Sequence, residues 1–372
     1  MTLKGALAQV SMPELDAFAA LEAGHVIDDD VHQSWRIARA PTGNVTPEDF
    51  TWHEAAVPEP GDGEVLLKTL YLGLAPVMRF YMQGLPAAGE VPLSLGDIIH
   101  GRGVAQIVKS RNAAWREGEI VQGQLGWQTY KVSGMTAKEK FIRMPNNGLP
   151  AALGAGVLGM KGMSAYAGYM ICGEPRAGDL TVLSGAAGGV GSLVSQMAAN
   201  VVGAKVIGIA GGPEKCALIK RYGCAEAIDY KSDDVGAMLD AFLPDGLDMY
   251  FDNIGGKVLD LCLDRLRLRA RIILCGAISE YVEKGTTSSL PGYRRIGRTD
   301  SRLQGFFVYN YMDQWTIAME HMADWIKSGK LQPLIDENQG FQSMPRALAR
   351  MYYGRNVGVT YTSVRGEPDG WG

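Results

Sequence analysis

The sequence predicts an α/β protein in which an irregular β-barrel domain is joined to a doubly wound parallel-sheet domain. A chain of 372 residues is long for one hydrophobic core and favours two domains. Up to about residue 145, short alternating β-type runs recur between prolines and glycines, whereas strand-like and helix-like segments alternate beyond residue 150. The apolar run at residues 180–184 leads directly into a glycine-rich turn, which a helix-like segment follows.

Residues 1–32 precede both patterns and are expected to form an N-terminal arm. The segment 11–14 has the Ser-x-x-Glu spacing of a capping box, with proline in the first turn. Leu15, Phe18 and Leu21 would then share one face of a helix. We expect the arm to pack on its own domain; the alternative is a contact with a second subunit.

The barrel domain is expected to combine residues 33–150 with residues 311–372, because the β-like piece near the end of the sequence can return to the barrel. A helix is expected at 314–328 and the returning strand at 357–363. The strands expected in the first part of this domain are 35–38, 64–71, 103–108, 120–125, 127–132 and 140–143.

Residues 151–310 are expected to form the parallel-sheet domain as an insertion. Buried parallel strands need crossover helices, and helix-like segments follow most of the strand-like runs here. The expected strands are 180–184, 205–210, 227–229, 249–252, 270–275 and 303–308, and the expected helices are 192–202, 213–222, 235–242 and 257–266.

Composition argues against several classes of protein. A net charge of −4 leaves no basic footprint for nucleic acid. No apolar run is long enough to span a bilayer, and the first residues lack the pattern of a secretory signal, so we expect a cytoplasmic protein. The five cysteines and five histidines are scattered without a C-x-x-C pair. This argues against a disulfide framework or a zinc lobe, and leaves a catalytic zinc without an evident ligand set.

The glycine-rich turn matches G-x-G-x-x-G at Ala186, Gly188 and Gly191, with alanine in place of the first glycine. Gly188 would let the backbone approach a pyrophosphate, and Gly191 would let the helix pack closely on the strand. The turn therefore favours a dinucleotide site; the alternative is an ordinary glycine-rich turn between a strand and a helix.

The end of the next expected strand distinguishes the two nicotinamide dinucleotides. NAD-binding units usually carry an acid there, about 20 residues beyond the glycines, to hold the ribose hydroxyls. This chain instead reads Ala-Gly-Gly-Pro at 210–213, followed by Glu214 and Lys215 in the first turn of a helix. A lysine and an open backbone suit a ribose phosphate that a carboxylate would repel. We therefore predict NADP; the alternative is that Lys215 is only a solvated helix residue.

A series of motifs, taken in their order and spacing, resembles the zinc-independent branch of the medium-chain dehydrogenase/reductase superfamily. Within that branch the chain is similar to the NADP-dependent alkenal/one reductases, which include prostaglandin, plant double-bond and curcumin reductases. The motifs are Gly-Met-Ser-Ala-Tyr at 162–166, the turn at 186–191, and the segments 214–215, 230–231, 250–256, 275–281, 304–308 and 356–358.

The resemblance implies a GroES-like barrel domain for the substrate and a Rossmann domain for NADPH. It also implies a homodimer, as is usual in this family. The residues that it places around the cofactor are Met163, Ala187, Gly188, Gly189, Val190, Lys215, Tyr230, Asn253, Cys275, Ala277, Ile278, Ser279, Tyr281, Phe307, Val308 and Asn356. No metal site is implied.

Three departures from the family pattern concern the expected site. Residues 75–79 read Ala-Pro-Val-Met-Arg where the family usually has Asp-Pro-Tyr-Met-Arg, so Ala75 and Val77 predict an altered substrate pocket. Lys161 stands where a proline is usual, and Val359 where a lysine is common. Aromatic residues near the expected cleft favour an apolar or aromatic substrate.

The implied reaction is reduction of a carbon–carbon double bond conjugated to a carbonyl group. Negative charge develops on the carbonyl oxygen, and a hydrogen-bond donor must stabilise it. The resemblance assigns this catalytic role to the hydroxyl of Tyr281, with an aromatic lining residue as the alternative. Two other functions remain open: an NADPH:quinone reductase of the same fold, and a non-catalytic NADP-binding sensor or interaction protein.

Overall fold

The computed structural model describes residues 13–85, 91–280 and 290–371. The chain forms two compact units: unit 1 contains the described residues of Met1–Gly159, Ile335–Asn356 and Thr360–Gly372, and unit 2 those of Met160–Leu334 and Val357–Val359. The predicted fold class is confirmed, because unit 1 carries an antiparallel sheet and unit 2 a parallel one. Within the described segments, no helix has the length and apolar character needed to cross a membrane.

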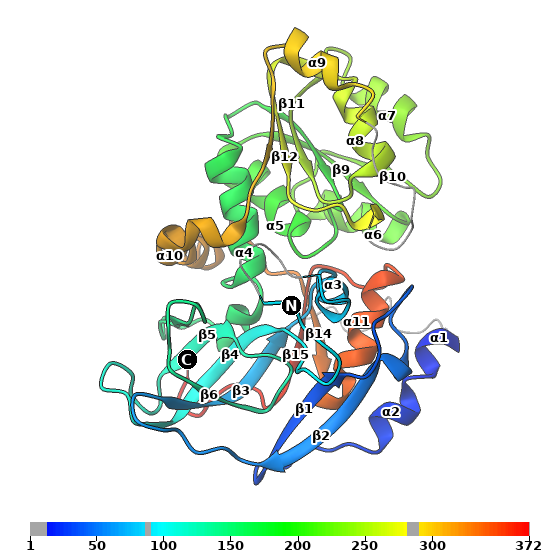
Figure 1. The fold of residues 1–372 in the computed structure, drawn as a ribbon. Coiled ribbons are helices and arrows are strands. Elements are labelled where there is room, and N and C mark those ends of the chain that lie inside the picture. The colour runs from blue at the N-terminus through cyan, green and yellow to red at the C-terminus, as the bar shows by residue number, and fades with distance from the viewer. Residues whose placement is uncertain (1–12, 86–90, 281–289, 372) are drawn as a thin grey trace. The chain divides into compact units, whose positions relative to one another are not determined.

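Unit 1 is built on a sheet of seven strands, counted over the described residues, in the order β14-β15-β3-β4-β5-β7, with β6 pairing to β3 (Figure 1). Strand β3 pairs antiparallel with β15, β4 and β6, and a separate antiparallel pair joins β1 to β2. The strands of unit 1 are β1 (Val31–Ile37), β2 (Phe50–Ala56), β3 (Val65–Gly73), β4 (Arg102–Ser110), β5 (Ile120–Gln124), β6 (Tyr130–Ser133), β7 (Ile142–Arg143), β14 (Ile335–Gln339) and β15 (Val359–Ser363).

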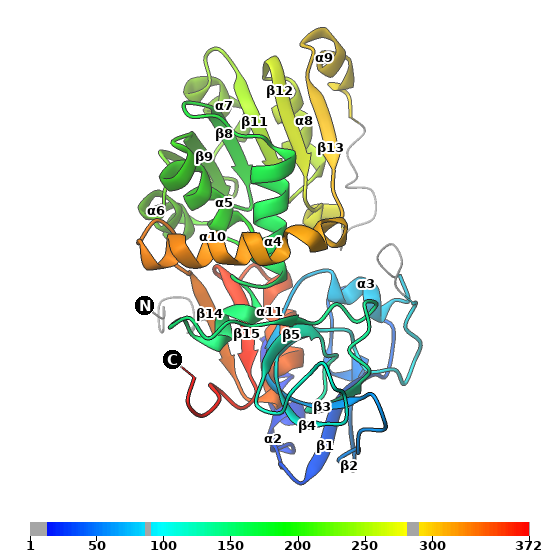
Figure 2. The ribbon, with the colours of Figure 1, turned by 90° about the vertical axis from the view of Figure 1, so that its left-hand side faces the viewer.

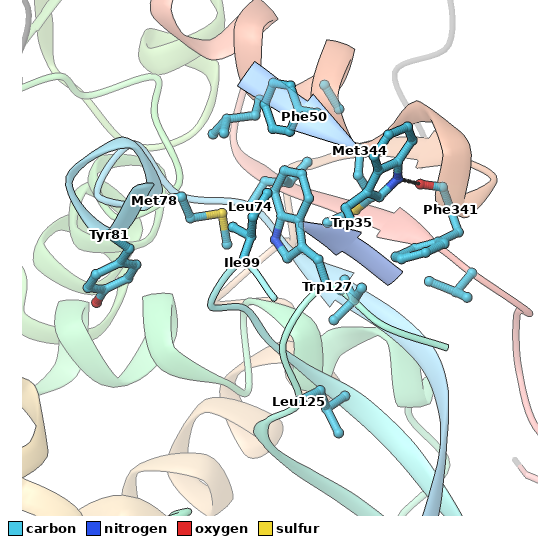
Figure 3. Packing of buried hydrophobic residues seen from close by; sticks show 14 of the residues in the cluster. Trp35, Phe50, Leu74, Met78, Tyr81, Ile99, Leu125, Trp127, Phe341 and Met344 are labelled. Atoms are coloured by element: carbon cyan, nitrogen blue, oxygen red, sulfur yellow. Dashed lines mark hydrogen bonds between the residues drawn. The ribbon is translucent and has the colours of Figure 1, made fainter. Parts of the chain in front are cut away.

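Aromatic side chains from distant parts of the chain form the core of unit 1 (Figure 3). The indole Nε1 of Trp35 in β1 donates to the carbonyl oxygen of Phe341 at 3.0 Å. The ring of Phe50 in β2 stacks on Trp127, with ring centroids 5.9 Å apart. Met344, at the start of α11 (Met344–Tyr352), is buried in the same cluster. Truncating such a side chain to alanine typically costs about 2–5 kcal/mol, so this core depends on both early and late segments of the sequence.

The described part of the N-terminal arm packs on unit 1. It forms two short helices, α1 (Pro13–Asp16) and α2 (Ala19–Ala23), rather than one continuous helix. Leu15 and Phe18 are buried in the core of unit 1, and Leu21 packs against its edge. The predicted apolar face is therefore present, whereas the capping box begins at Ser11, which lies outside the described residues.

Unit 2 contains a six-stranded parallel sheet, as far as its residues are described, in the order β10-β9-β8-β11-β12-β13. Helices cover both of its faces, as Figures 1 and 2 show. The strands are β8 (Leu180–Ser184), β9 (Lys205–Ala210), β10 (Glu226–Asp229), β11 (Leu247–Asp252), β12 (Leu266–Leu274) and β13 (Arg302–Gly305). The helices are α4 (Met160–Ala165), α5 (Gly191–Gln196), α6 (Pro213–Arg221), α7 (Val235–Phe242), α8 (Gly256–Leu263), α9 (Tyr293–Arg298) and α10 (Trp315–Lys327), and π-helical segments continue α4 through Tyr166–Cys172 and α5 through Met197–Val202.

Several observed boundaries differ from the expected ones. The helix expected at 257–266 ends at Leu263, because strand β12 already begins at Leu266. The strand expected at 303–308 ends at Gly305, and a 3-10 segment, η6 (Val308–Gln314), follows. Residues 311–334 lie in unit 2 and not with the antiparallel sheet. The reason is the apolar face of α10, which is buried through Trp315, Ala318, Met319, Met322 and Ala323 and packs beside α4.

Candidate functional site

The glycine-rich turn after β8 is held by main-chain hydrogen bonds within unit 2. The amide of Ala186 donates to Ile209 at the end of β9 (3.0 Å), and the amide of Gly358 donates to Ala187 (2.7 Å). A Cβ atom at Gly191 would lie 2.2 Å from the carbonyl oxygen of Gly185, which no side chain tolerates. The predicted role of Gly191, close packing of the helix on the strand, therefore agrees with this geometry.

The same turn leaves part of its backbone exposed at the start of α5. Gly188, Gly189 and Val190 are partly exposed, whereas Ala186 and Ala187 are buried beneath them. No side chain caps the start of α5, and its first turn contains no acidic residue. A partly exposed backbone at a helix start, without a competing carboxylate, favours an anionic group. These residues could hold the diphosphate of a dinucleotide.

A second group of predicted residues surrounds the turn between β9 and α6. A Cβ atom at Gly211 would lie 2.7 Å from the ring of Tyr230, so only glycine leaves room for that half-exposed ring. Lys215 lies in the following helix, α6. Tyr230 thus packs against the first of the two glycines, and Lys215 follows them in the first turn of α6.

Asp229, at the end of β10, belongs to this region and was missed by the sequence analysis. Its Oδ1 accepts hydrogen bonds from the amides of Gly212 (2.8 Å) and Lys231 (3.0 Å). The amide of Gly212 contributes most to lowering the pKa of this carboxyl group. A signal for it exists, since aspartate often accepts a bond from the amide two residues later in a turn. The carboxylate is thereby engaged by the backbone that shapes the glycine turn.

Asp252 organises the region where β8 and β11 end. Its Oδ1 accepts from the hydroxyls of Ser184 (2.9 Å) and Tyr250 (2.7 Å), and from the amides of Ile254 and Gly255 (2.9 Å each). Asp252 is 1% exposed, and its Oδ2 has no hydrogen-bond partner among the described residues. Burial raises the pKa of Asp252 despite these hydrogen bonds.

Asn253 follows Asp252 and is fixed by the end of β8. Its side-chain amide donates to the carbonyl oxygen of Ser184 at 2.8 Å, and its main-chain amide donates to the Ser184 hydroxyl at 2.9 Å. Asn253 therefore lies at the carboxyl end of the parallel strands, the edge at which ligands of such sheets bind.

The segment after β12, predicted to border the nicotinamide, is tied to the same network. The amide of Cys275 donates to the carbonyl oxygen of Asp252 (2.8 Å), and that of Ile278 to Asn253 (3.3 Å). Ser279 donates to the carbonyl of Ile254 through both its amide (3.1 Å) and its hydroxyl (2.6 Å). Burial, with a contribution from Asp252, raises the pKa of the Cys275 thiol to about 12, which keeps it neutral at ordinary pH. Ala277 lies between these anchored residues.

The remaining predicted residues differ in their placement. Phe307 and Val308 follow β13, the strand that pairs with β12, and Val308 is buried. The side chain of Met163, in α4, is fully buried. Asn356 belongs to unit 1. Tyr281, the predicted catalytic residue, lies outside the described residues.

Ala75 and Val77, whose departure from the family pattern predicts an altered substrate pocket, lie in unit 1. Ala75 and Val77 directly precede the short helix α3 (Met78–Met82). The carbonyl of Pro76 accepts from the hydroxyl of Tyr352 at 2.5 Å, and the buried Arg79 donates to the carbonyl of Gly43 at 2.5 Å. No group of three or more His, Cys, Asp or Glu side chains that could hold a metal ion occurs in residues 13–85, 91–280 and 290–371.

Two family models match the chain. One, described as the N-terminal domain of oxidoreductase, covers residues 33–141, and the other, described as zinc-binding dehydrogenase, covers residues 189–324. Relatives match along most of their length. The 2-alkenal reductase (NADP(+)-dependent) of Nicotiana tabacum is 36% identical, over 84% of this chain and 90% of its own. Prostaglandin reductase 1 of Bos taurus is 35% identical, over 88% of this chain and 97% of its own. The NADPH-dependent curcumin reductase of Escherichia coli is 33% identical, over 90% of this chain and 98% of its own.

Solved structures give the same result. CurA from Vibrio vulnificus is 31% identical and superposes with a TM-score of 0.83, over 91% of this chain and 100% of its own. A second structure of CurA, in complex with NADPH, has the same identity and TM-score.

The parallel sheet with its glycine turn has the architecture of a dinucleotide-binding domain, and the relatives make the chain an NADP-dependent oxidoreductase. With these relatives, the chain belongs to the medium-chain dehydrogenase/reductase superfamily, in its group of NADP-dependent alkenal/one reductases. The predicted family, the enzyme class and the cofactor NADP are confirmed.

Proposed function

We propose that the protein uses NADPH to reduce the carbon–carbon double bond of α,β-unsaturated carbonyl compounds. The observation that carries this proposal is the match along most of the chain to relatives named for such double-bond reductions, including 2-alkenal reductase and the (+)-pulegone reductase of Mentha piperita. The glycine turn and the Lys215–Tyr230 region support it, since both suit the cofactor that this reaction needs.

Each part of the proposed cofactor site has a distinct task. When bound, NADPH supplies the hydride that reduces the β-carbon of the substrate. The turn at Gly188–Val190 binds the diphosphate, and Lys215 with Tyr230 binds the adenosine phosphate. Asn253, together with the anchored segment that contains Cys275, Ala277, Ile278 and Ser279, borders the nicotinamide, and Phe307, Val308 and Asn356 close around the same ring.

Tyr281 has the proposed catalytic task. Its hydroxyl donates a hydrogen bond to the carbonyl oxygen of the substrate, where negative charge develops as the β-carbon is reduced. A proton then reaches the α-carbon, from Tyr281 or from water. Ala75 and Val77 replace an acid and a tyrosine and so alter the proposed substrate pocket. The aromatic residues near the expected cleft support an apolar or aromatic substrate.

The test is NADPH oxidation by the purified protein across enals, enones, nitroalkenes and benzoquinones, with NADH in parallel. We expect turnover of some conjugated enones or enals, with NADPH preferred. If the quinones oxidise NADPH and no enal or enone does, the protein is a quinone reductase. If NADPH binds tightly and nothing is turned over, the protein is an NADP-binding sensor or interaction protein, and the proposed activity is wrong.

We also propose a homodimer in the cytoplasm, in which unit 1 binds the substrate and unit 2 the cofactor. Sedimentation at several protein concentrations tests the oligomeric state. A monomer at all concentrations would exclude the homodimer without affecting the proposed reaction.

A further inference from the structure

The side chain of Lys161 lies on the glycine-rich turn. Lys161 is the second residue of α4, within unit 2, and is half-buried. A Cβ atom placed on Gly189 would lie 2.9 Å from its Cδ and 3.4 Å from its Cε. The aliphatic part of the lysine therefore passes directly over the Cα of Gly189, in space that a side chain at that position would occupy.

This placement brings a cation to a surface that otherwise carries no charge. Residues 186–190 are alanine, glycine and valine, and the first turn of α5 contains neither acidic nor basic residues. The neutral amides of the turn therefore gain a positive charge only from a neighbouring segment. A lysine ammonium is a compact charge that commonly binds phosphate groups in proteins.

The other segment that touches the turn supplies no cation. The segment Val357–Val359 also touches the turn, because the amide of Gly358 donates to Ala187 at 2.7 Å. Val359 in that segment is fully buried and carries no charge. The lysine over Gly189 comes instead from α4. One segment beside the turn thus lacks a cation and another carries one.

We propose that Lys161 binds the diphosphate of the dinucleotide, as a cofactor-binding residue additional to those predicted from the sequence. The proposal rests on the cofactor site of the proposed function, but not on the identity of the substrate. Because NADPH and NADH share the diphosphate and differ in the ribose phosphate, Lys161 contributes equally to the binding of both. Lys215, by contrast, would contribute to NADPH alone.

The experiment measures dissociation constants for NADPH and NADH by calorimetry, without any substrate. Lys161→Met keeps the aliphatic stem over Gly189 and removes the charge, and Lys161→Arg keeps the charge. Lys215→Met is the comparison for the ribose phosphate. Lys220→Met is the control, because Lys220 is an exposed residue of α6 that pairs with Glu226.

We expect Lys161→Met to weaken the binding of NADPH and of NADH by a similar factor, about tenfold. This is the loss expected for one charge-assisted hydrogen bond to a phosphate. Lys161→Arg should retain most of the affinity, and raising the salt concentration should weaken binding less in Lys161→Met than in the unmodified protein. Lys215→Met should weaken the binding of NADPH alone, and Lys220→Met should weaken the binding of neither dinucleotide.

Unchanged constants for both dinucleotides in Lys161→Met would overturn the proposal, and the stem would then only cover Gly189. A loss of affinity confined to NADPH would also overturn it, because Lys161 would then contact the ribose phosphate.

Thermal unfolding of each variant shows whether it is folded, and Lys161→Gln serves as a second neutral variant. If neither neutral variant folds, the lysine is structural and the proposal is wrong. Since no substrate is used, absence of enone reduction leaves this result intact.

Discussion

The Ser184 hydroxyl donates a hydrogen bond to Oδ1 of Asp252 across 2.9 Å and so joins the carboxyl ends of β8 and β11. Oδ1 also accepts two amides at the start of α8, those of Ile254 and Gly255. Both the glycine turn after β8 and the segment after β12 therefore depend on one buried carboxyl group. In the sequence Asp252 is one residue of the segment 250–256, and the structure shows that it positions the surrounding backbone.

Replacing Asp252 should destabilise the protein in a graded way. Asp252→Ala leaves the donors of Ser184, Tyr250, Ile254 and Gly255 without their acceptor in a buried place, so we expect a loss of about 3–5 kcal/mol. Asp252→Asn keeps an acceptor at Oδ1 and should cost less. Urea unfolding monitored by fluorescence measures both. Equal losses in the two variants would show that the hydrogen bonds at Oδ1 are not the important feature.

The raised pKa of Asp252 predicts a pH dependence with a definite sign. Because burial raises the pKa, the folded protein holds this proton more tightly than the unfolded chain. The stabilisation from the neutral form is fully present below the ordinary pKa of aspartate and is lost as the pH rises through the folded pKa. Asp252→Asn cannot titrate, so its stability relative to the unmodified protein should increase over that range. A difference in unfolding free energy that stays constant with pH would contradict this.

The close approach at Gly191 predicts a strong effect of a single methyl group. Gly191→Ala would put its Cβ 2.2 Å from the carbonyl oxygen of Gly185, so the helix must move away from the strand. We expect a loss of about 1–3 kcal/mol, the range typical of overpacked cores, together with weaker NADPH binding. The control is Gly24→Ala, since nothing lies within 4 Å of a Cβ there and its φ is −90°. Thermal unfolding and calorimetric titration give both quantities.

The assignment of NADP predicts a selective effect at α6. Lys215→Ala should raise the Michaelis constant for NADPH by about tenfold or more and leave that for NADH nearly unchanged, because only NADPH carries the ribose phosphate. Steady-state kinetics with an accepted enone measure both constants. An unchanged preference between the two dinucleotides would exclude a phosphate role for Lys215.

The proposed role of Tyr281 predicts that loss of its hydroxyl lowers turnover but leaves cofactor binding unchanged. Tyr281→Phe removes only the hydroxyl, so turnover should fall by about 10²–10³-fold, the loss typical of one oxyanion donor. The dissociation constant of NADPH should stay nearly the same. Full turnover in this variant would mean that another group donates to the carbonyl oxygen.

Local patterns predicted unit 2 more fully than unit 1. Strands β8 and β9 have the bounds expected from their apolar runs, and helix α7 does as well, because Asp234 caps its first turn. In unit 1, β2 and β14 were missed. Strand β2 is largely exposed, and β14 reads Ile-Asp-Glu-Asn-Gln, so neither shows the apolar alternation by which strands are recognised.

The residues of the candidate site also differ in how far local patterns predicted them. The glycines and Lys215 were predicted because their roles depend on local spacing along the chain. The contacts of Asp252 with Ser184, and of Lys161 with Gly189, join segments far apart in the sequence. Which residues meet across such distances is decided by tertiary packing, and no local pattern in one sequence contains that information.

The hydrogen bond from Trp35 to Phe341 has a consequence for biosynthesis. It joins residues 306 apart, and nearly all of unit 2 lies between them in the sequence. On the ribosome, residues 160–334 are complete before the segment that closes the core of unit 1 has been made. Unit 2 can thus fold during translation, whereas unit 1 must wait for its last strands. A nascent chain that stalls before residue 341 leaves Trp35 without its partner, as a target for chaperones and proteases.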